Sequence, residues 1–261
     1  MNQPSLEIIA RQLFEVSPLK QRKLAMLRDM MDAPAGLRSL DIGSDNGVIS
    51  LLLREQGGEW SSADLIPDTV EAIRKLVGER VYLMEERSIP CPAESFDQVL
   101  VVDMLEHVHD DRACLAEIRR VLRPGGVLVI NVPNPHEGLL RKLRFRLGQT
   151  DEAHGHVRPG YSLAALEQLL GADFSIERSR SYARVFSELI DTAIVGGLDL
   201  LKGGKRGKKG KVVTADDLAK MNKTFKLYRL IAPFLRFFMF LDGLVPFLHG
   251  NMLIVRARRI S

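Results

Sequence analysis

Residues 37–48 read Leu37-Arg38-Ser39-Leu40-Asp41-Ile42-Gly43-Ser44-Asp45-Asn46-Gly47-Val48. An apolar strand pattern is followed by an acid, a glycine turn and the start of a helical pattern, which is the order of a nucleotide-binding βα turn. Asp41 stands before the first glycine, whereas a phosphate-binding loop presents glycines and bare backbone N–H groups. Because a carboxylate at the strand tip would repel a pyrophosphate, the turn favours a ligand that carries positive charge.

The size and composition indicate a globular protein with one large domain or one domain with an elaboration. The chain has 261 residues, of which 46% are hydrophobic and 27% charged. Its net charge of +4 is too mild to indicate a nucleic-acid partner by itself. Cys91 and Cys114 fit no metal or redox spacing, which predicts two reduced thiols in a cytoplasmic protein. We expect neither a signal peptide nor a transmembrane helix, because the required apolar runs are missing.

Strand and helix patterns alternate along most of the chain after a helical stretch at 5–32. This alternation predicts an α/β fold with a parallel sheet and helices on both faces. The segment Gln98-Val99-Leu100-Val101-Val102 presents apolar residues on both faces, as a central parallel strand should. The expected strands are 37–42, 59–64, 80–84, 97–102, 126–132, 173–183 and 251–258, and the expected helices are 46–56, 68–77, 110–122, 136–147 and 162–171.

Two acids after the glycine turn stand where a nucleoside would need them. Asp64 ends the second strand, 21 residues after Gly43, where a carboxylate can accept both ribose hydroxyls. Glu85 ends the third strand and is a candidate partner for an adenine amino group. Gly47 is expected to let the following helix approach closely. Asp45 is open to three interpretations: an N-cap of that helix, a contact to the ligand, or a weakened site.

Over roughly residues 37–175 the chain carries an ordered set of motifs: Leu40-Asp41-Ile42-Gly43, Asp64, Ser88-Ile89-Pro90, Phe96-Asp97-Gln98-Val99, Asp103-Met104-Leu105-Glu106-His107-Val108, Val121-Leu122-Arg123-Pro124-Gly125-Gly126 and Asn131-Val132-Pro133-Asn134. In this order and spacing they resemble the class I S-adenosylmethionine (SAM) methyltransferases, particularly the type 11-like group of small bacterial enzymes. The resemblance implies a Rossmann-like, doubly wound sheet of seven strands with the last one antiparallel, and SAM lying across the carboxyl ends of the first strands. Asp41 and Gly43 would face its methionine end, Asp64 the ribose and Glu85 the adenine. The implied cofactor positions are Asp41, Gly43, Ser44, Asp45, Gly47, Asp64, Leu65, Glu85 and Asp103.

Candidate catalytic residues follow from what methyl transfer to oxygen requires, namely an aligned nucleophile and a group that takes its proton. His107 follows the fourth strand and is one candidate base, although in the family this histidine commonly just starts a helix. Asp103, Glu106 and His107 would share one face of a helical turn. Quinone-biosynthesis O-methyltransferases, which this region resembles, have a comparable cluster that can hold a divalent metal, so these three residues are candidate metal ligands.

The loop 153–161 holds two histidines, an arginine and a tyrosine before a predicted helix. In the family this loop often covers the acceptor pocket. We therefore expect His154 or His156 to act as the base or to contact the acceptor, with Arg158 as a candidate anion contact. The alternative is that these are exposed loop residues or residues that pack at the start of the helix.

Residues 185–249 are an insertion that a compact sheet does not need, and they divide the chain into a SAM-binding domain, 1–184 with 250–261, and a helical cap. The run 202–211 is glycine-rich and cationic, which predicts a mobile loop. The segment 218–249 holds six of the eleven phenylalanines. It is either a cap over the acceptor pocket or a contact to an anionic membrane surface, or both.

The leading hypothesis is SAM-dependent methylation, at oxygen, of a small or amphipathic acceptor such as a lipid, a quinone or a lipid-linked saccharide. The alternatives are a methyltransferase of a polar metabolite or sugar, and a non-catalytic SAM-fold binding module. An NAD dehydrogenase is disfavoured because the turn lacks G-x-G-x-x-G. No nucleic-acid partner is expected. The predicted location is cytoplasmic, with peripheral attachment at the inner face of the membrane as an option.

Overall fold

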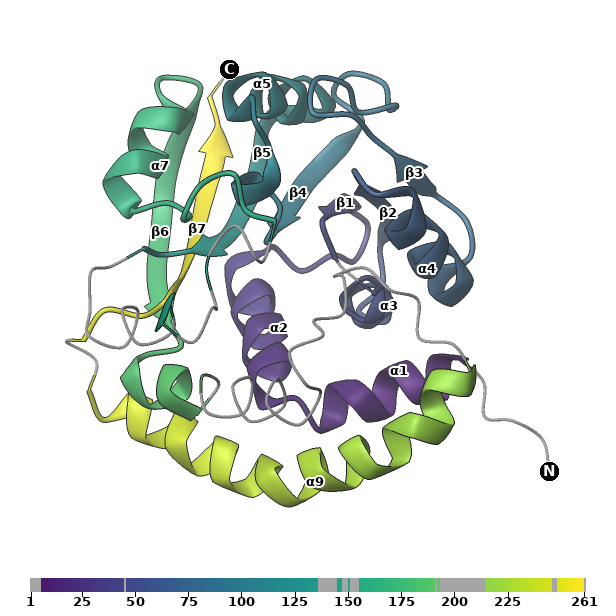
Figure 1. Cartoon of the computed structure of the whole chain (residues 1–261). Helices are drawn as coiled ribbons and strands as arrows, with labels where there is room; N and C mark the ends of the chain where they lie inside the picture. Colours follow the sequence, from purple (N-terminus) through teal and green to yellow (C-terminus); the bar gives the residue numbers. More distant parts are fainter. Residues whose placement is uncertain are drawn as a thin grey trace.

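The computed structural model in Figure 1 describes residues 6–44, 46–135, 145–146, 150, 155–190, 192, 215–245 and 248–260, with backbone only for 215–228. Three predicted features lie largely or wholly outside these residues: the helix 136–147, the helix 185–201 beyond its helical first turns at 185–190, and the basic loop 202–211. Asp45 and His154 also lie outside them, so a ligand contact at Asp45 and the role of His154 stay predictions. The interpretation of Asp45 as the N-cap of the following helix is wrong, because that helix begins at Val48 and its N-cap is Gly47.

The described strands form one seven-stranded sheet in the order β3-β2-β1-β4-β5-β7-β6. The first five strands pair in parallel, and β7 runs antiparallel to both β5 and β6. The predicted doubly wound sheet with an antiparallel last strand is confirmed. The strands are β1 (Arg38–Ile42), β2 (Glu59–Asp64), β3 (Val81–Leu83), β4 (Phe96–Val102), β5 (Leu122–Pro133), β6 (Phe174–Tyr182) and β7 (Met252–Arg259).

Helices cover both faces of this sheet (Figure 1). Alternate residues of the strands point to opposite faces, so each strand contributes to two cores. One core joins Leu40 and Val99 to α5 and α7, and the other joins Leu100 to α2 and α3. The helices are α1 (Leu6–Glu15), α2 (Pro18–Met30), α3 (Val48–Arg54), α4 (Pro67–Val77), the 3₁₀ turn η1 (Leu105–His107), α5 (Asp111–Val121), α7 (Leu163–Leu170) and α9 (Ala215–Gly243).

Strand β5 starts earlier than predicted. The sequence around Pro124 and Gly125 indicates a turn before a strand at 126–132, but β5 begins at Leu122, which pairs with Phe96 across a register shift. Arg123 donates to an Asp97 carboxylate oxygen at 2.5 Å, which holds the irregular stretch against β4.

Helix α9 curves along the side of the molecule toward which the parallel strands run, beyond α1 and α2 (Figure 1). Near its end the carboxylate of Asp242 is buried and accepts the backbone N–H groups of Arg184 at 2.8 Å and Phe186 at 2.9 Å. These bonds fasten α9 to the chain that leaves β6. In the described part of the chain, no helix combines the length and the apolar character that crossing a bilayer requires.

Candidate active site

Asp41 on β1 is a buried hydrogen-bond centre. Its carboxylate accepts the hydroxyls of Ser44, of Ser50 at 2.6 Å and of Ser62 at 2.8 Å. These three serines belong to the glycine turn, to α3 and to β2, so one carboxylate ties the three segments together. Because the side chain is fully buried, its oxygens interact with the protein interior.

The two glycines of the turn have backbone conformations and neighbours that exclude a side chain. Gly43 has φ +83°, and a Cβ there would lie 2.4 Å from the carbonyl oxygen of Val102. Gly47 has φ +80°, and a Cβ there would lie 2.9 Å from the Cα of Ile73 on α4. The turn therefore packs directly on the end of β4, and α3 packs closely on α4, as the sequence predicts.

Asp64 and Glu85 follow the neighbouring strands at the same edge of the sheet. Asp64 is buried at the end of β2 and accepts the backbone N–H of Ile66 at 2.9 Å, which fixes the turn that contains the half-buried Leu65. Glu85 is exposed, two residues beyond β3. Because β3, β2, β1 and β4 are adjacent, the predicted cofactor residues in the described chain gather at one edge.

Asp103 belongs to a polar network that sequence reasoning missed. It follows β4 with φ +48°, forms an ion pair with Lys23 of α2 and accepts the amide N–H of Asn131 at 2.6 Å. The hydroxyl of Tyr182 donates to the Asn131 carbonyl oxygen at 2.7 Å. Burial raises the pKa of Tyr182 well above its ordinary value, and the charge of Asp103 adds to this shift. Asp103 and Asn131 stood in quoted motifs, but the sequence holds no signal that would pair them with Lys23 or Tyr182.

The expected cluster of Asp103 with Glu106 and His107 is wrong in its geometry. The positive φ of Asp103 turns the chain away after β4, and helical structure begins only at Leu105. The acid and the histidine therefore do not share a helical turn.

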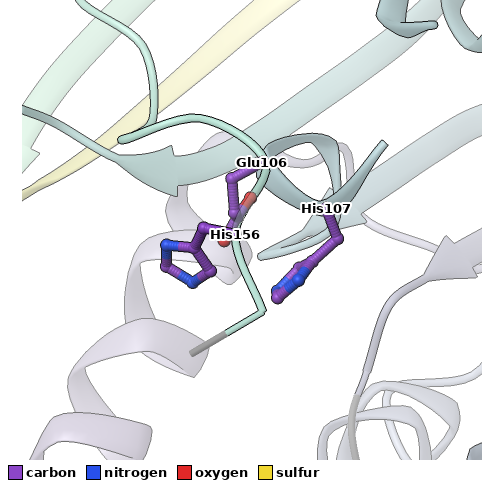
Figure 2. Close-up of side chains that lie close together, drawn as sticks. All are labelled: Glu106, His107 and His156. Atoms are coloured by element: carbon purple, nitrogen blue, oxygen red, sulfur yellow. The ribbon is translucent and has the colours of Figure 1, made fainter. Parts of the chain in front are cut away.

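A different cluster forms around Glu106 (Figure 2). His156, which belongs to the loop before α7, approaches both Glu106 and His107 of η1. The two imidazole rings stand edge to face with centroids 4.8 Å apart. One ligand atom of each of the three residues lies within 4.8 Å of the others. The N–H of Val157 donates to the Glu106 carbonyl oxygen at 2.9 Å, which holds this loop over η1.

The tautomer of His107 follows from its partner. Its Nδ1 lies 2.9 Å from the carbonyl oxygen of Gly155. Because a carbonyl only accepts, Nδ1 carries the proton of the neutral ring and the lone pair is on Nε2. In its neutral form His107 would therefore accept a proton at Nε2.

The guanidinium of Arg158 is bonded to neighbouring groups and holds residues 155–161 of the loop in place. Its guanidinium pairs with Asp111 and donates to the carbonyl oxygens of Val108 at 2.7 Å and His109 at 3.0 Å. Tyr161 donates to the same Asp111 carboxylate at 2.8 Å, and burial raises its pKa. The guanidinium of Arg158 thus ties residues 155–161 of the loop to residues 108–111, and an anion contact at Arg158 stays a prediction.

A sheet in this order, with a glycine turn after β1 and an acid at the end of β2, defines the class I SAM-dependent methyltransferase fold. Residues 40–130 match the family described as "Methyltransferase domain". Over residues 40–130 the chain is thus similar to methyltransferase domains.

Two curated relatives are similar over part of the chain, and both are named "Ubiquinone biosynthesis O-methyltransferase". The one from Xanthomonas axonopodis pv. citri is 34% identical over 108 residues, which covers 39% of this chain and 45% of the relative. The one from Xylella fastidiosa strain M23 is 32% identical over 107 residues, covering 38% and 43%. The match thus spans less than half the length of these relatives.

Solved structures show the same fold at low identity. A SAM-dependent methyltransferase from Mesorhizobium loti has a TM-score of 0.55 at 18% identity, over 90% of this chain and 96% of its own. The [4+2]-cyclase SpnF has a TM-score of 0.57 at 19% identity, over 93% of this chain and 82% of its own. Since the second name describes a cyclase, the fold alone does not determine the reaction.

Proposed function

We propose that the chain transfers the methyl group of SAM to an oxygen atom of a small, amphipathic acceptor. The observation that carries this proposal is the placement of His107 and His156 around Glu106, directly after β4, which lies beside β1 and its glycine turn. The edge of the sheet would hold the sulfonium, and the histidine cluster would face the acceptor.

The cofactor would be held by residues with distinct roles. Asp64 would accept the ribose hydroxyls, Glu85 the adenine amino group, and the close-packed turn at Gly43 would receive the methionine end. Asp41 would act through the three hydroxyls that it orders, as a positioning residue for this turn. The negative charges at this edge suit a cationic sulfonium.

When bound, SAM would supply an activated methyl group: an acceptor oxygen would form the new O–C bond in line as the S–C bond breaks to leave the neutral thioether. The acceptor proton goes to a histidine, for which His107 Nε2 is our first candidate and His156 our second. Glu106, buried beside both rings, would stabilise the imidazolium that results.

A divalent metal at Glu106, His107 and His156 is the second candidate, favoured by the closeness of one carboxylate and two imidazoles. Such donors suit zinc or a similar ion, which would polarise the acceptor hydroxyl and lower its pKa. Titration of the isolated protein with zinc would distinguish the two: binding that His156→Ala abolishes supports the metal, and equal binding in the variant contradicts it.

A quinone, a lipid or a lipid-linked saccharide is the acceptor class that we favour, because the matched relatives are named for ubiquinone biosynthesis. Transfer of labelled methyl groups into a cell extract, followed by separation of lipid and aqueous fractions, tests this choice. Label in the aqueous fraction alone would favour a polar metabolite or sugar. Absence of SAM binding in calorimetry would favour a binding module without catalysis. We further propose a cytoplasmic location with peripheral attachment to the inner face of the membrane.

A further inference from the structure

The outward face of α9 exposes large apolar side chains in helical register. Leu230, Phe234, Phe237 and Phe240 of α9, and Leu244 directly after its last residue, are each between 57% and 69% exposed. At about 100° per residue they fall within a sector of roughly 120° on one side of the helix. A contiguous apolar patch of this kind marks a site of interaction on a folded protein.

The opposite face of the same helix is packed, so α9 is held with its apolar side chains outward. Ala232 and Leu235 are buried, and Phe238 lies against Phe186 with ring centroids 6.3 Å apart. The buried Asp242 caps backbone N–H groups beyond β6. Both faces of the helix are thus apolar, but only the inner one has a partner among the described residues.

The exposed charged side chains that α9 itself carries are cationic over the residues whose side chains the structure describes, 229–243. Between residues 229 and 245 the charged side chains are the exposed Arg229 and Arg236 and the buried Asp242. Two copies of this face docked on each other would bring their arginines together, whereas an anionic surface would complement them. The sequence just before α9 adds six cations and no acid within 202–211.

Helix α9 lies on the side of the molecule toward which the parallel strands run, with α1 and α2 between it and the sheet (Figure 1). Lys23 of α2 reaches Asp103 at the end of β4, and Arg236 of α9 donates to the carbonyl oxygen of Glu15 at 3.4 Å, just before α2. Layers of helix therefore run from the carboxyl ends of the strands to α9 (Figure 1).

We propose that the outward face of α9 is a docking surface for an anionic lipid bilayer, on which the helix lies parallel to the membrane with its aromatic side chains in the headgroup region. The choice of a bilayer over another partner rests in part on the proposed amphipathic acceptor. The surface itself is argued from exposure and charge alone, so it can be tested without catalysis.

The test is flotation of the full chain with vesicles, in the absence of SAM and acceptor. One set of vesicles contains phosphatidylcholine alone, and the other contains phosphatidylcholine with a third of phosphatidylglycerol. We expect binding to the anionic set that falls at least tenfold in Phe234→Gln/Phe237→Gln/Phe240→Gln. Arg229→Gln should weaken binding to the anionic set and make its loss with salt shallower, because less electrostatic attraction is left to screen.

A matched pair of single-residue variants controls for a general effect of removing apolar surface. Phe240→Gln should lower vesicle binding severalfold, while Ile260→Gln, which removes an exposed apolar side chain near the C-terminal end of β7, should leave it unchanged. Circular dichroism confirms that the variants fold. Equal binding of the triple variant and the parent protein would overturn the proposal. So would a parent protein that binds neither set of vesicles and forms a dimer that the triple variant does not form. Loss of methyl transfer with vesicle binding intact would count against the proposed function only.

Discussion

At the residue scale, Asp41 and Asp64 stand at neighbouring strand ends and differ in what they can bind. Three hydroxyls engage the carboxylate of Asp41 in the interior, while that of Asp64 takes a backbone N–H from its own turn. The first arrangement shapes the turn, and the second orients a carboxylate at the edge where the cofactor would lie.

Asp64→Ala should weaken SAM binding at least tenfold, roughly 1.4 kcal/mol, because two hydroxyl contacts would be lost. Isothermal titration calorimetry measures this change. Asp68→Ala removes an exposed carboxylate in the first turn of α4 and serves as the control. An unchanged affinity in Asp64→Ala would remove the residue from the ribose role.

Asp41→Ala should lower the free energy of unfolding by about 2–4 kcal/mol, because three hydroxyls lose their shared acceptor. Urea denaturation measures the loss. Ser50→Ala, which removes one of the three donors, should cost about 1 kcal/mol. If both variants cost the same, the carboxylate does not act as a shared centre.

His156→Ala should reduce kcat by about 10²-fold or more while leaving SAM affinity unchanged, since a proton acceptor or its neighbour is lost. His107→Ala should do the same if the pair acts together. His249→Gln changes an exposed histidine outside the cluster and should retain full activity. Equal loss of SAM affinity in His156→Ala would point to a structural role for this loop.

At the element scale, the strands and helices of the sheet are well predicted because the spacing of apolar residues is a local property of the sequence. The alternation of strand and helix patterns predicts the parallel sheet, and the glycine turn predicts which edge of the sheet would hold the ligand. The start of β5 escaped prediction because Pro124 and Gly125 read locally as a turn, while the pairing of Leu122 with Phe96 depends on a distant strand. The approach of His156 to Glu106 escaped for the same reason: the contact spans 50 residues of chain.

Deletion of the basic run 202–211 should reduce binding to anionic vesicles at low salt, by about 1 kcal/mol per cation that lies near the surface. Vesicle flotation at two salt concentrations measures the effect. Replacement of the same residues by a Gly/Ser linker of equal length separates charge from length. Binding that survives both changes at low salt would reject an electrostatic contribution from this run.

At the scale of the whole molecule, the loops after β3 and β4 are joined by Glu86. Its carboxylate accepts the backbone N–H groups of His109 at 3.0 Å and Asp110 at 3.1 Å. These bonds, led by the one from His109, lower the pKa of Glu86 below its ordinary value of 4.5. A carboxyl whose folded pKa is depressed stabilises the fold above its unfolded pKa, and this contribution is lost as the pH falls through the folded pKa.

Glu86→Gln should therefore flatten the decline in stability on acidification below about pH 4.5 and lower stability at neutral pH. Urea denaturation across a pH series measures both effects. Glu79→Gln, an exposed acid before β3, should keep the slope of the parent protein. A Glu86→Gln variant with the parent's slope would show that the two N–H bonds contribute little to acid sensitivity.

The anchoring of α9 by Asp242 has a mechanical consequence. Asp242 binds the N–H of Arg184, two residues beyond Tyr182, whose hydroxyl reaches Asn131, which in turn bonds to Asp103. A displacement of α9, for example when it binds a surface, would thus be transmitted through these few hydrogen bonds to Asp103 in the loop after β4. A partner bound to α9 would therefore also restrain the loop after β4.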